Sequence, residues 1–129
     1  MDNNLFEKFN TGSLRLPSGM VEFSGIPWTK HPDFDGVELK AIVTARDTGG
    51  QFSYHLVRIA PNMSIKNHVH KTQLETHEVI AGSGCCINDG TKITYKPGFI
   101  SIMPAGIPHE VTADQDGLYL FAKFIPALC

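Results

Sequence analysis

The sequence predicts an all-β protein with a sandwich or barrel architecture. From Gln51 onward, short segments rich in β-branched and aromatic residues follow one another, and Gly and Pro residues separate them. Apolar residues at helical spacing are not sustained over a useful length anywhere in the chain. The length of 129 residues suits one domain with one core. We therefore expect a single domain, with residues 1–36 as an N-terminal arm and residues 37–125 as the β-barrel.

The expected strands can be placed in chain order. Residues 37–43 alternate apolar and polar side chains, which is typical of a half-buried strand. Further strands are predicted at residues 52–60, 63–69, 76–81, 85–87, 91–95, 99–103, 109–113 and 118–124. Asp89-Gly90 predicts a tight hairpin turn, Gly82-Ser83-Gly84 predicts a second turn, and residues 114–117 predict a loop. The N-terminal arm is expected to be irregular, with its single tryptophan, Trp28, in a packing role.

Composition excludes several classes of function. The net charge of −2 provides no basic surface for nucleic acid, and runs of like charge are absent. No apolar stretch is long enough to span a bilayer, and the N-terminus lacks the basic and apolar regions of a signal peptide. The three cysteines, Cys85, Cys86 and Cys129, are an odd number with two adjacent, which is a poor disulfide framework. These features indicate a cytoplasmic protein without nucleic-acid or membrane partners.

Histidine and glutamate residues form the candidate functional site. His68 and His70 are two residues apart, so in an extended strand both imidazoles point to the same face. Glu75 follows after a short polar link, and a hairpin would bring its carboxylate to the two imidazoles. His109 follows a rigid turn rich in Pro and Gly and is a candidate for a fourth ligand. Two or three imidazoles with one carboxylate form a typical divalent-metal site.

These two segments resemble the paired motifs of the cupin superfamily. The first motif runs glycine, five residues, His-x-His, three or four residues, Glu, six residues, Gly. The second runs Gly, five residues, Pro-x-Gly, two residues, His, three residues, Asn. The positions that fit are His68, His70, Glu75 and Gly82 in the first motif and Gly98, Pro104, Gly106 and His109 in the second.

Three positions depart from the family pattern. The opening glycine of the first motif is Asn62, the closing asparagine of the second is Ala113, and the common acidic residue of the second is Phe99. None of them is a ligand position. The resemblance implies a double-stranded β-helix, the jelly-roll cupin barrel, with a metal held by His68, His70, Glu75 and His109.

This ligand set suits Fe, Mn, Ni, Co or Zn better than Ca or Mg, and leaves two positions open on an octahedral ion. His77 lies two residues beyond Glu75, so it is expected to point inward, as a candidate acid or base, an alternative ligand, or a supporting core histidine. His55 and Tyr54 lie on opposite faces of one strand, so at most one is expected to face the pocket. Arg58 and Lys123 could steer an anionic substrate, although solvated positions are the default for both.

The resemblance leaves two main functions open. One is a metal-dependent enzyme that acts on a small organic molecule, as a dioxygenase or as a Lewis-acid isomerase or lyase. The other is a non-enzymatic, metal-bearing domain that binds or senses a small ligand, and a vestigial site is a third reading. The resemblance also implies a homodimer formed through the N-terminal arm, where Leu14, Leu16, Val21 and Phe23 lie at alternating positions.

Overall fold

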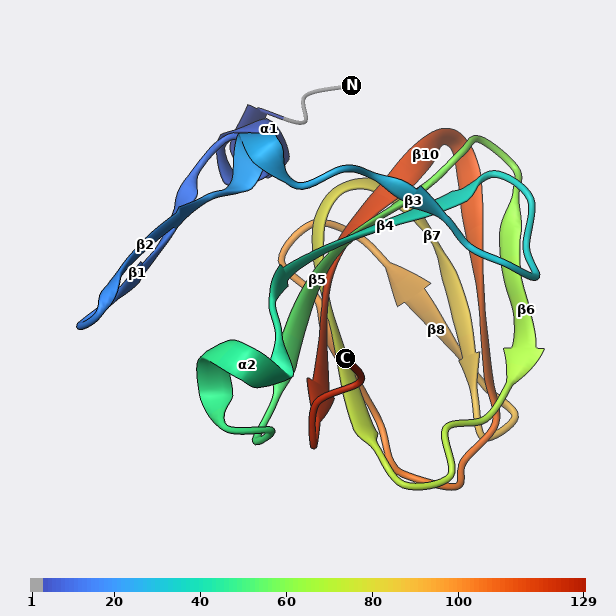
Figure 1. Ribbon diagram of the computed structural model, residues 1–129. Helices are drawn as coiled ribbons and strands as arrows, with labels where there is room; N and C mark the ends of the chain where they lie inside the picture. The colour runs from blue at the N-terminus through green and yellow to red at the C-terminus, as the bar shows by residue number, and fades with distance from the viewer. Residues whose placement is uncertain (1–3) are drawn as a thin grey trace.

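Two long antiparallel strands, β7 (Leu74–Asn88) and β10 (His109–Ile125), pair with each other and organise the fold. The computed structural model describes residues 4–129, so the first three residues of the predicted arm lie outside the described residues. Both strands bend, and with them a single eight-stranded sheet curves into a barrel (Figure 1). This architecture confirms the predicted jelly-roll barrel.

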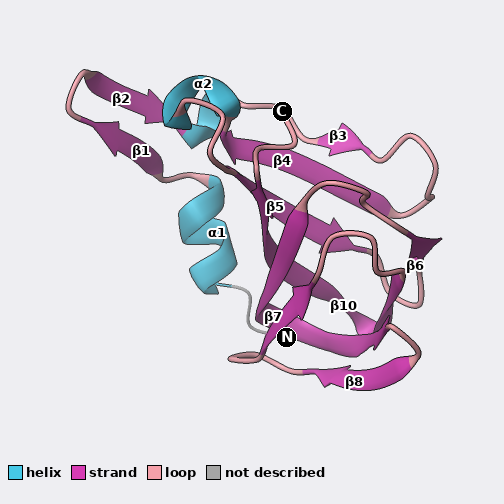
Figure 2. Ribbon diagram, turned by 90° about the horizontal axis from the view of Figure 1, so that it is seen from below, coloured by secondary structure: helices cyan, strands magenta, loops and turns pink. Residues whose placement is uncertain are grey.

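The remaining strands pair with these two. β10 pairs with β5 (Ser53–Ile59) through its C-terminal part and with β6 (Ser64–His68) through its N-terminal part. β7 pairs with β9 (Ile100–Met103) near its start and with β8 (Thr91–Tyr95) near its end. β4 (Val37–Val43) and β3 (Thr29–Lys30) extend the sheet beyond β5, as Figure 2 shows from below. The observed β4 has the bounds that its alternating sequence predicts.

The bends in β7 and β10 face each other at two glycines. Gly82 and Gly117 both have positive φ angles, of 76° and 80°, and the register of the two strands shifts between Ala113 and Leu118. A Cβ atom on Gly82 would lie 2.1 Å from the carbonyl oxygen of Gly117. Only glycine fits this close approach, which lets both strands turn the barrel corner. The predicted turn at residues 82–84 and the predicted loop at 114–117 are therefore wrong, because the strands bend there without ending.

Two apolar clusters pack on the two faces of the main sheet. The first fills the barrel interior and contains residues such as Val57, Val111 and Leu120. The second lies outside the sheet and includes Phe121 and Leu56. The N-terminal segment covers this outer cluster, because the fully buried Phe6 packs its ring 6.4 Å from that of Phe121. The barrel interior is thus left to the first cluster and to the polar site described below.

The N-terminal arm is more regular than predicted. It comprises α1 (Asn4–Asn10), the hairpin β1 (Ser13–Leu16) and β2 (Gly19–Glu22), and the short 3-10 helix η1 (Phe23–Gly25). The hairpin extends away from the barrel (Figure 1). Trp28 has the expected packing role, with its ring stacked 6.0 Å from Phe6 and its Nε1 donating a 3.1 Å hydrogen bond to Asn10.

Two short helices that the sequence pattern did not predict accompany the strands. α1 is only seven residues long, too short for apolar periodicity to emerge. α2 (Ala45–Thr48) is a single turn, held by a capping box between Thr44 and Asp47 and ended by Gly49 in the left-handed conformation. Neither helix, nor any other in residues 4–129, has the length and apolar character needed to cross a membrane.

Candidate metal centre

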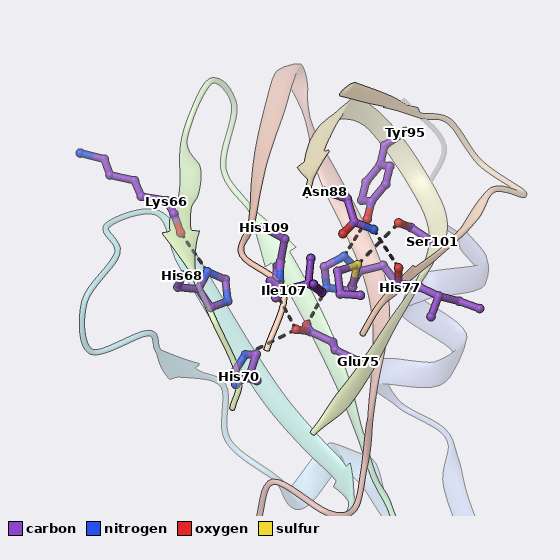
Figure 3. Close-up of polar contacts among 12 residues, drawn as sticks. Lys66, His68, His70, Glu75, His77, Asn88, Tyr95, Ser101, Ile107 and His109 are labelled. Carbon is purple, nitrogen blue, oxygen red and sulfur yellow. Dashed lines mark hydrogen bonds and ion pairs between the residues drawn. The ribbon is translucent and has the colours of Figure 1, made fainter. Parts of the chain in front are cut away.

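Four predicted ligand residues meet inside one end of the barrel. His68 is the last residue of β6, His70 follows it, Glu75 lies at the second position of β7, and His109 begins β10. One candidate ligand atom from each of them lies within 4.8 Å of the others. The rings of His68 and His109 have centroids 4.3 Å apart, because these two residues pair across β6 and β10. Figure 3 shows the three imidazoles gathered around the carboxylate of Glu75.

Backbone contacts hold the two motif segments in this register. Gly106, in the Pro-rich turn before β10, donates its backbone N–H to the carbonyl of His70 at 2.8 Å. The positive φ of Gly106, 79°, is one that a turn of this kind demands and that glycine adopts without strain. The turn therefore connects the second motif directly to the first.

Hydrogen bonds to backbone carbonyls orient two of the imidazoles. Nδ1 of His68 lies 2.8 Å from the carbonyl oxygen of Lys66, and Nδ1 of His109 lies 3.3 Å from that of Ile107. Because a carbonyl oxygen only accepts, each Nδ1 carries the hydrogen. The Nε2 lone pairs of both rings are then free to bind a cation, which is how proteins orient histidine ligands.

Two buried atoms in the centre lack hydrogen-bond partners. Nε2 of His109 and Oε1 of Glu75 are 3.0 Å apart, yet within the described chain neither has a hydrogen-bond partner. Nε2 of His70 also lies 3.4 Å from the same carboxylate oxygen. A buried polar atom without a partner is costly, so natural proteins rarely retain one. A divalent cation bound to these lone pairs would satisfy them, so the residues present fit a metal ion.

His77 and Tyr95 hold the other carboxylate oxygen. Nε2 of His77 donates to Oε2 of Glu75 at 2.7 Å, and the hydroxyl of Tyr95 lies 2.9 Å from Nδ1 of His77. All three side chains are buried. His77 thus points inward, as its spacing predicts, and leaves Oε1 of Glu75 facing the three imidazoles (Figure 3).

The protonation of the centre suits a cation. Burial alone would raise the pKa of Glu75, but the charge of His77 and hydrogen bonding outweigh it and hold the pKa well below its usual range. Burial lowers the pKa of His68 and of His70. At neutral pH Glu75 is therefore a carboxylate and the rings of His68 and His70 are neutral, which are the forms that bind metal.

A cavity of about 70 Å³ adjoins the centre. Apolar side chains form much of its wall, among them Leu39, Val57 and Phe124. Of the two candidates on β5, His55 lines the cavity, while Tyr54 packs outside the sheet against Phe121. Burial lowers the pKa of His55 to about 4, so its ring is neutral at neutral pH.

Arg58 and Lys123 do not line the cavity. Arg58 forms a 2.9 Å ion pair with Glu38 and lies 3.9 Å over the ring of Trp28. Lys123 lies 3.7 Å from Glu78. Their positions match the default expectation of surface charges and give no support to the idea that they steer a substrate.

Sequence reasoning did not identify three residues around the site. Tyr95 lies 18 residues from His77 and supports it, while His31, just after β3, and Leu128, in the segment after β10, line the cavity. No local pattern marks any of them. The pairing of Gly84 with Tyr95 across the hairpin β7–β8 brings the tyrosine near, and it was missed because residues 82–84 were expected to form a turn and not to continue the strand.

Comparisons with known proteins agree with this geometry. A family model described as "Cupin domain" matches residues 55–121, slightly more than half of the chain. A comparison with curated protein sequences found no match.

Similar solved structures share the fold at low identity. A predicted oxalate decarboxylase from Thermotoga maritima is 18% identical, with a TM-score of 0.73, over 80% of this chain and 95% of that one. The polyketide cyclase RemF from Streptomyces resistomycificus is 19% identical, with a TM-score of 0.69, over 82% of this chain and 77% of that one. Ectoine synthase from P. lautus is 20% identical, with a TM-score of 0.66, over 74% and 68%. These likenesses concern the fold alone.

Proposed function

The chain belongs to the cupin family, and from this premise we propose that it is a metal-dependent enzyme acting on a small organic molecule. The ion is a divalent transition metal, from among Fe, Mn, Ni, Co and Zn, and the substrate binds beside it in the barrel. The proposed ligands are His68, His70, Glu75 and His109. The similar solved structures include a predicted oxalate decarboxylase, a polyketide cyclase and an ectoine synthase, which supports this class of activity.

One observation carries the proposal: the unpartnered atoms Oε1 of Glu75 and Nε2 of His109 lie 3.0 Å apart in a buried site. The chain retains the cost of burying these two atoms, while its other buried polar side chains, such as His77 and Ser53, find partners. A site selected only for packing would be expected to satisfy or replace them. A cation bound at this point removes the cost.

The bound ion and the side chains around it would have different roles. The ion would supply Lewis-acid chemistry in an isomerase or lyase, and redox chemistry in a dioxygenase. Glu75 presents one oxygen to the ion because His77 holds the other. Both ring nitrogens of His77 are engaged, by Glu75 and by Tyr95, which favours a positioning role over the alternative role of acid or base. The apolar wall at Val57 and Phe124 keeps water from the reacting end of the substrate.

A non-enzymatic, metal-bearing domain that binds or senses a small ligand is the alternative. The observation that favours it concerns the residues lining the cavity. Apart from the proposed ligands and His77, the ionisable side chains described there are His31 and His55. Burial lowers the pKa of His55 to about 4, so its ring is poorly matched to acid–base work near neutral pH, and burial also lowers the pKa of the partly exposed His31.

Two further proposals concern assembly and location. We propose a homodimer in which the hairpin β1–β2 contacts a second copy, supported by the extension of this hairpin away from the barrel (Figure 1) and by its exposed Met20. A light-scattering mass equal to one chain would refute it. We also propose a cytoplasmic location, supported by the free thiols of Cys85, Cys86 and Cys129.

Metal analysis and turnover together test the function. Purified wild-type protein is expected to retain about one transition-metal ion per chain, and His109→Ala to retain much less. His31→Ala is the matched control, because His31 lines the same cavity but is not a proposed ligand. The Fe(II) form is then offered diketones, catechols and hydroxy acids in air. Metal retention without turnover of any of them would favour the binding domain over the enzyme, and equal metal content in wild type and His109→Ala would refute both.

A further inference from the structure

The segment after β10 folds back against the barrel and closes one side of the cavity. Ala127 donates its backbone N–H to the carbonyl of Gly50 at 3.1 Å, and Ala45 donates to the carbonyl of Cys129 at 2.6 Å. Between them, the backbone N–H of Leu128 donates to Oγ of Ser53 at 2.9 Å. Figure 1 shows this segment lying beside β5. Three hydrogen bonds therefore hold residues 127–129 in a defined position.

This position places Leu128 in the cavity wall. Leu128 lines the cavity together with His31 and His70, and all three keep some exposure to solvent, which for Leu128 is 43%. The deeper lining residues, such as Glu75 and His77, are buried. Leu128 therefore lies where the cavity opens, at the end away from the buried carboxylate.

Ser53 joins the same segment to His55. Its Oγ accepts the N–H of Leu128 and lies 2.9 Å from Nε2 of His55. When Ser53 donates its hydroxyl hydrogen to Nε2, His55 carries its own hydrogen on Nδ1. Nδ1 has no hydrogen-bond partner within the described chain, although His55 is only 4% exposed and lines the cavity. In this tautomer, His55 brings to the cavity lining one N–H group for which the described residues supply no acceptor.

Charge and volume limit what can bind. No Lys or Arg is among the described cavity-lining residues, so the cavity offers a ligand no fixed cation other than a bound metal. Its volume of about 70 Å³ equals roughly two water molecules at liquid density, so only a few non-hydrogen atoms fit. Leu39, Val57 and Leu128 offer these atoms an apolar surface. A phosphorylated or polyanionic ligand is thus disfavoured.

We propose that the site takes a small ligand that chelates through two oxygens and carries a short, uncharged substituent, that Leu128 limits the length of this substituent, and that His55 donates a hydrogen bond to the ligand. This inference rests on the proposed metal site and deepens it by naming the ligand class and two selecting residues. Deprotonated hydroxy acids, keto acids and hydroxamates belong to this class.

A series of alkyl hydroxamates tests the role of Leu128. Acetohydroxamate, butyrohydroxamate and hexanohydroxamate share one chelating group and differ only in chain length. Their affinities for the Co(II)-loaded protein are measured from changes in its visible spectrum. Wild type is expected to bind the shortest most tightly. Leu128→Ala is expected to improve binding of the longer ones by about fourfold per additional methylene accommodated, with acetohydroxamate within twofold of wild type.

The matched control is Ile125→Ala, because Ile125 is similarly exposed (41% against 43%), ends β10 just before this segment and does not line the cavity. It is expected to leave the chain-length preference unchanged. Leu128→Phe is expected to shift the preference further toward acetohydroxamate. For His55, replacement by Leu is expected to weaken binding of all three hydroxamates about threefold to tenfold, with His55→Gln recovering part of the loss.

The outcomes separate this inference from the proposed function. Normal cobalt content with the same chain-length preference in wild type, Leu128→Ala and Leu128→Phe would overturn the inference and leave the metal site standing. An absence of cobalt binding in wild type would refute the proposed function and this inference with it.

Discussion

Replacing His77 with leucine tests how the chain prepares Glu75 for a metal ion. The substitution removes the 2.7 Å hydrogen bond to Oε2 of Glu75 and leaves the hydroxyl of Tyr95 without its partner. A hydrogen bond to a charged group contributes about 1.5–3 kcal/mol. At a factor of ten per 1.4 kcal/mol, metal affinity should fall roughly 10- to 100-fold.

The measurement is a competition titration of Co(II) between the protein and a chelator of known affinity. His77→Gln is the matched variant, because its amide N–H can occupy the place of Nε2 and donate to the same oxygen. It should recover much of the affinity, and circular dichroism should show that both variants are folded. A folded His77→Leu protein with affinity within twofold of wild type, or a glutamine variant no better than the leucine one, would refute the positioning role.

Three further predictions concern the barrel, pH and metal binding. Gly82→Ala should destabilise the protein by about 2–5 kcal/mol in urea unfolding, because its Cβ would meet the carbonyl of Gly117 and its φ is positive. Gly90→Ala, with a φ of 78° and open space around it, should cost only about 1–2 kcal/mol, and equal losses would contradict the corner argument. The pKa of His55 is lowered from 6.5 to about 4, so its neutral form stabilises the fold fully above pH 6.5. As pH falls from 6.5 to 4, His55 gains a proton in the unfolded chain before it does so in the folded chain. The free energy of unfolding of wild type should therefore fall by about 3 kcal/mol more than that of His55→Gln, as measured by urea unfolding at pH 6.5 and pH 4. A transition metal at a thousand times its dissociation constant should raise the melting temperature of wild type by about 10–20 °C and that of Glu75→Ala much less.

The sequence predicted the barrel well because strands with one buried face must alternate. In β4, Val37 and Leu39 pack into the barrel core as the alternation predicts, whereas the register shift between Ala41 and Val43 puts the adjacent Ile42 and Val43 in the outer cluster. The Asp89-Gly90 turn was also predictable, and the structure confirms it, with φ angles of 50° and 78°. Local chemistry fixes such turns without help from the rest of the chain.

The bends at Gly82 and Gly117 could not be recognised as bends. A glycine within a polar segment indicates a turn, and nothing local distinguishes a turn from a strand that bends and continues. The difference arises because the two glycines face each other across the pair β7–β10, and that pairing joins residues about 35 positions apart. The helices α1 and α2 escaped prediction for a different reason, because each is too short to show a period.

One part of the candidate site could also be predicted from the sequence, and another part could not. The spacing of His68, His70, Glu75 and His109 was visible in the chain, and the structure brings them together. The support of His77 by Tyr95 was missed because β7 was expected to end at residue 81, and the place of Leu128 in the cavity wall depends on its hydrogen bond to Ser53, 75 residues away. Side chains that act through other residues can therefore be identified only from the structure of the folded barrel.

The most direct measurement of the central claim is anomalous X-ray diffraction from crystals of the Co(II)-loaded protein, collected at the cobalt absorption edge. The account predicts one strong peak about 2.0–2.2 Å from Oε1 of Glu75 and from a nitrogen of each of His68, His70 and His109. A peak bonded to other residues, or no peak at these four side chains at saturating cobalt, would contradict it.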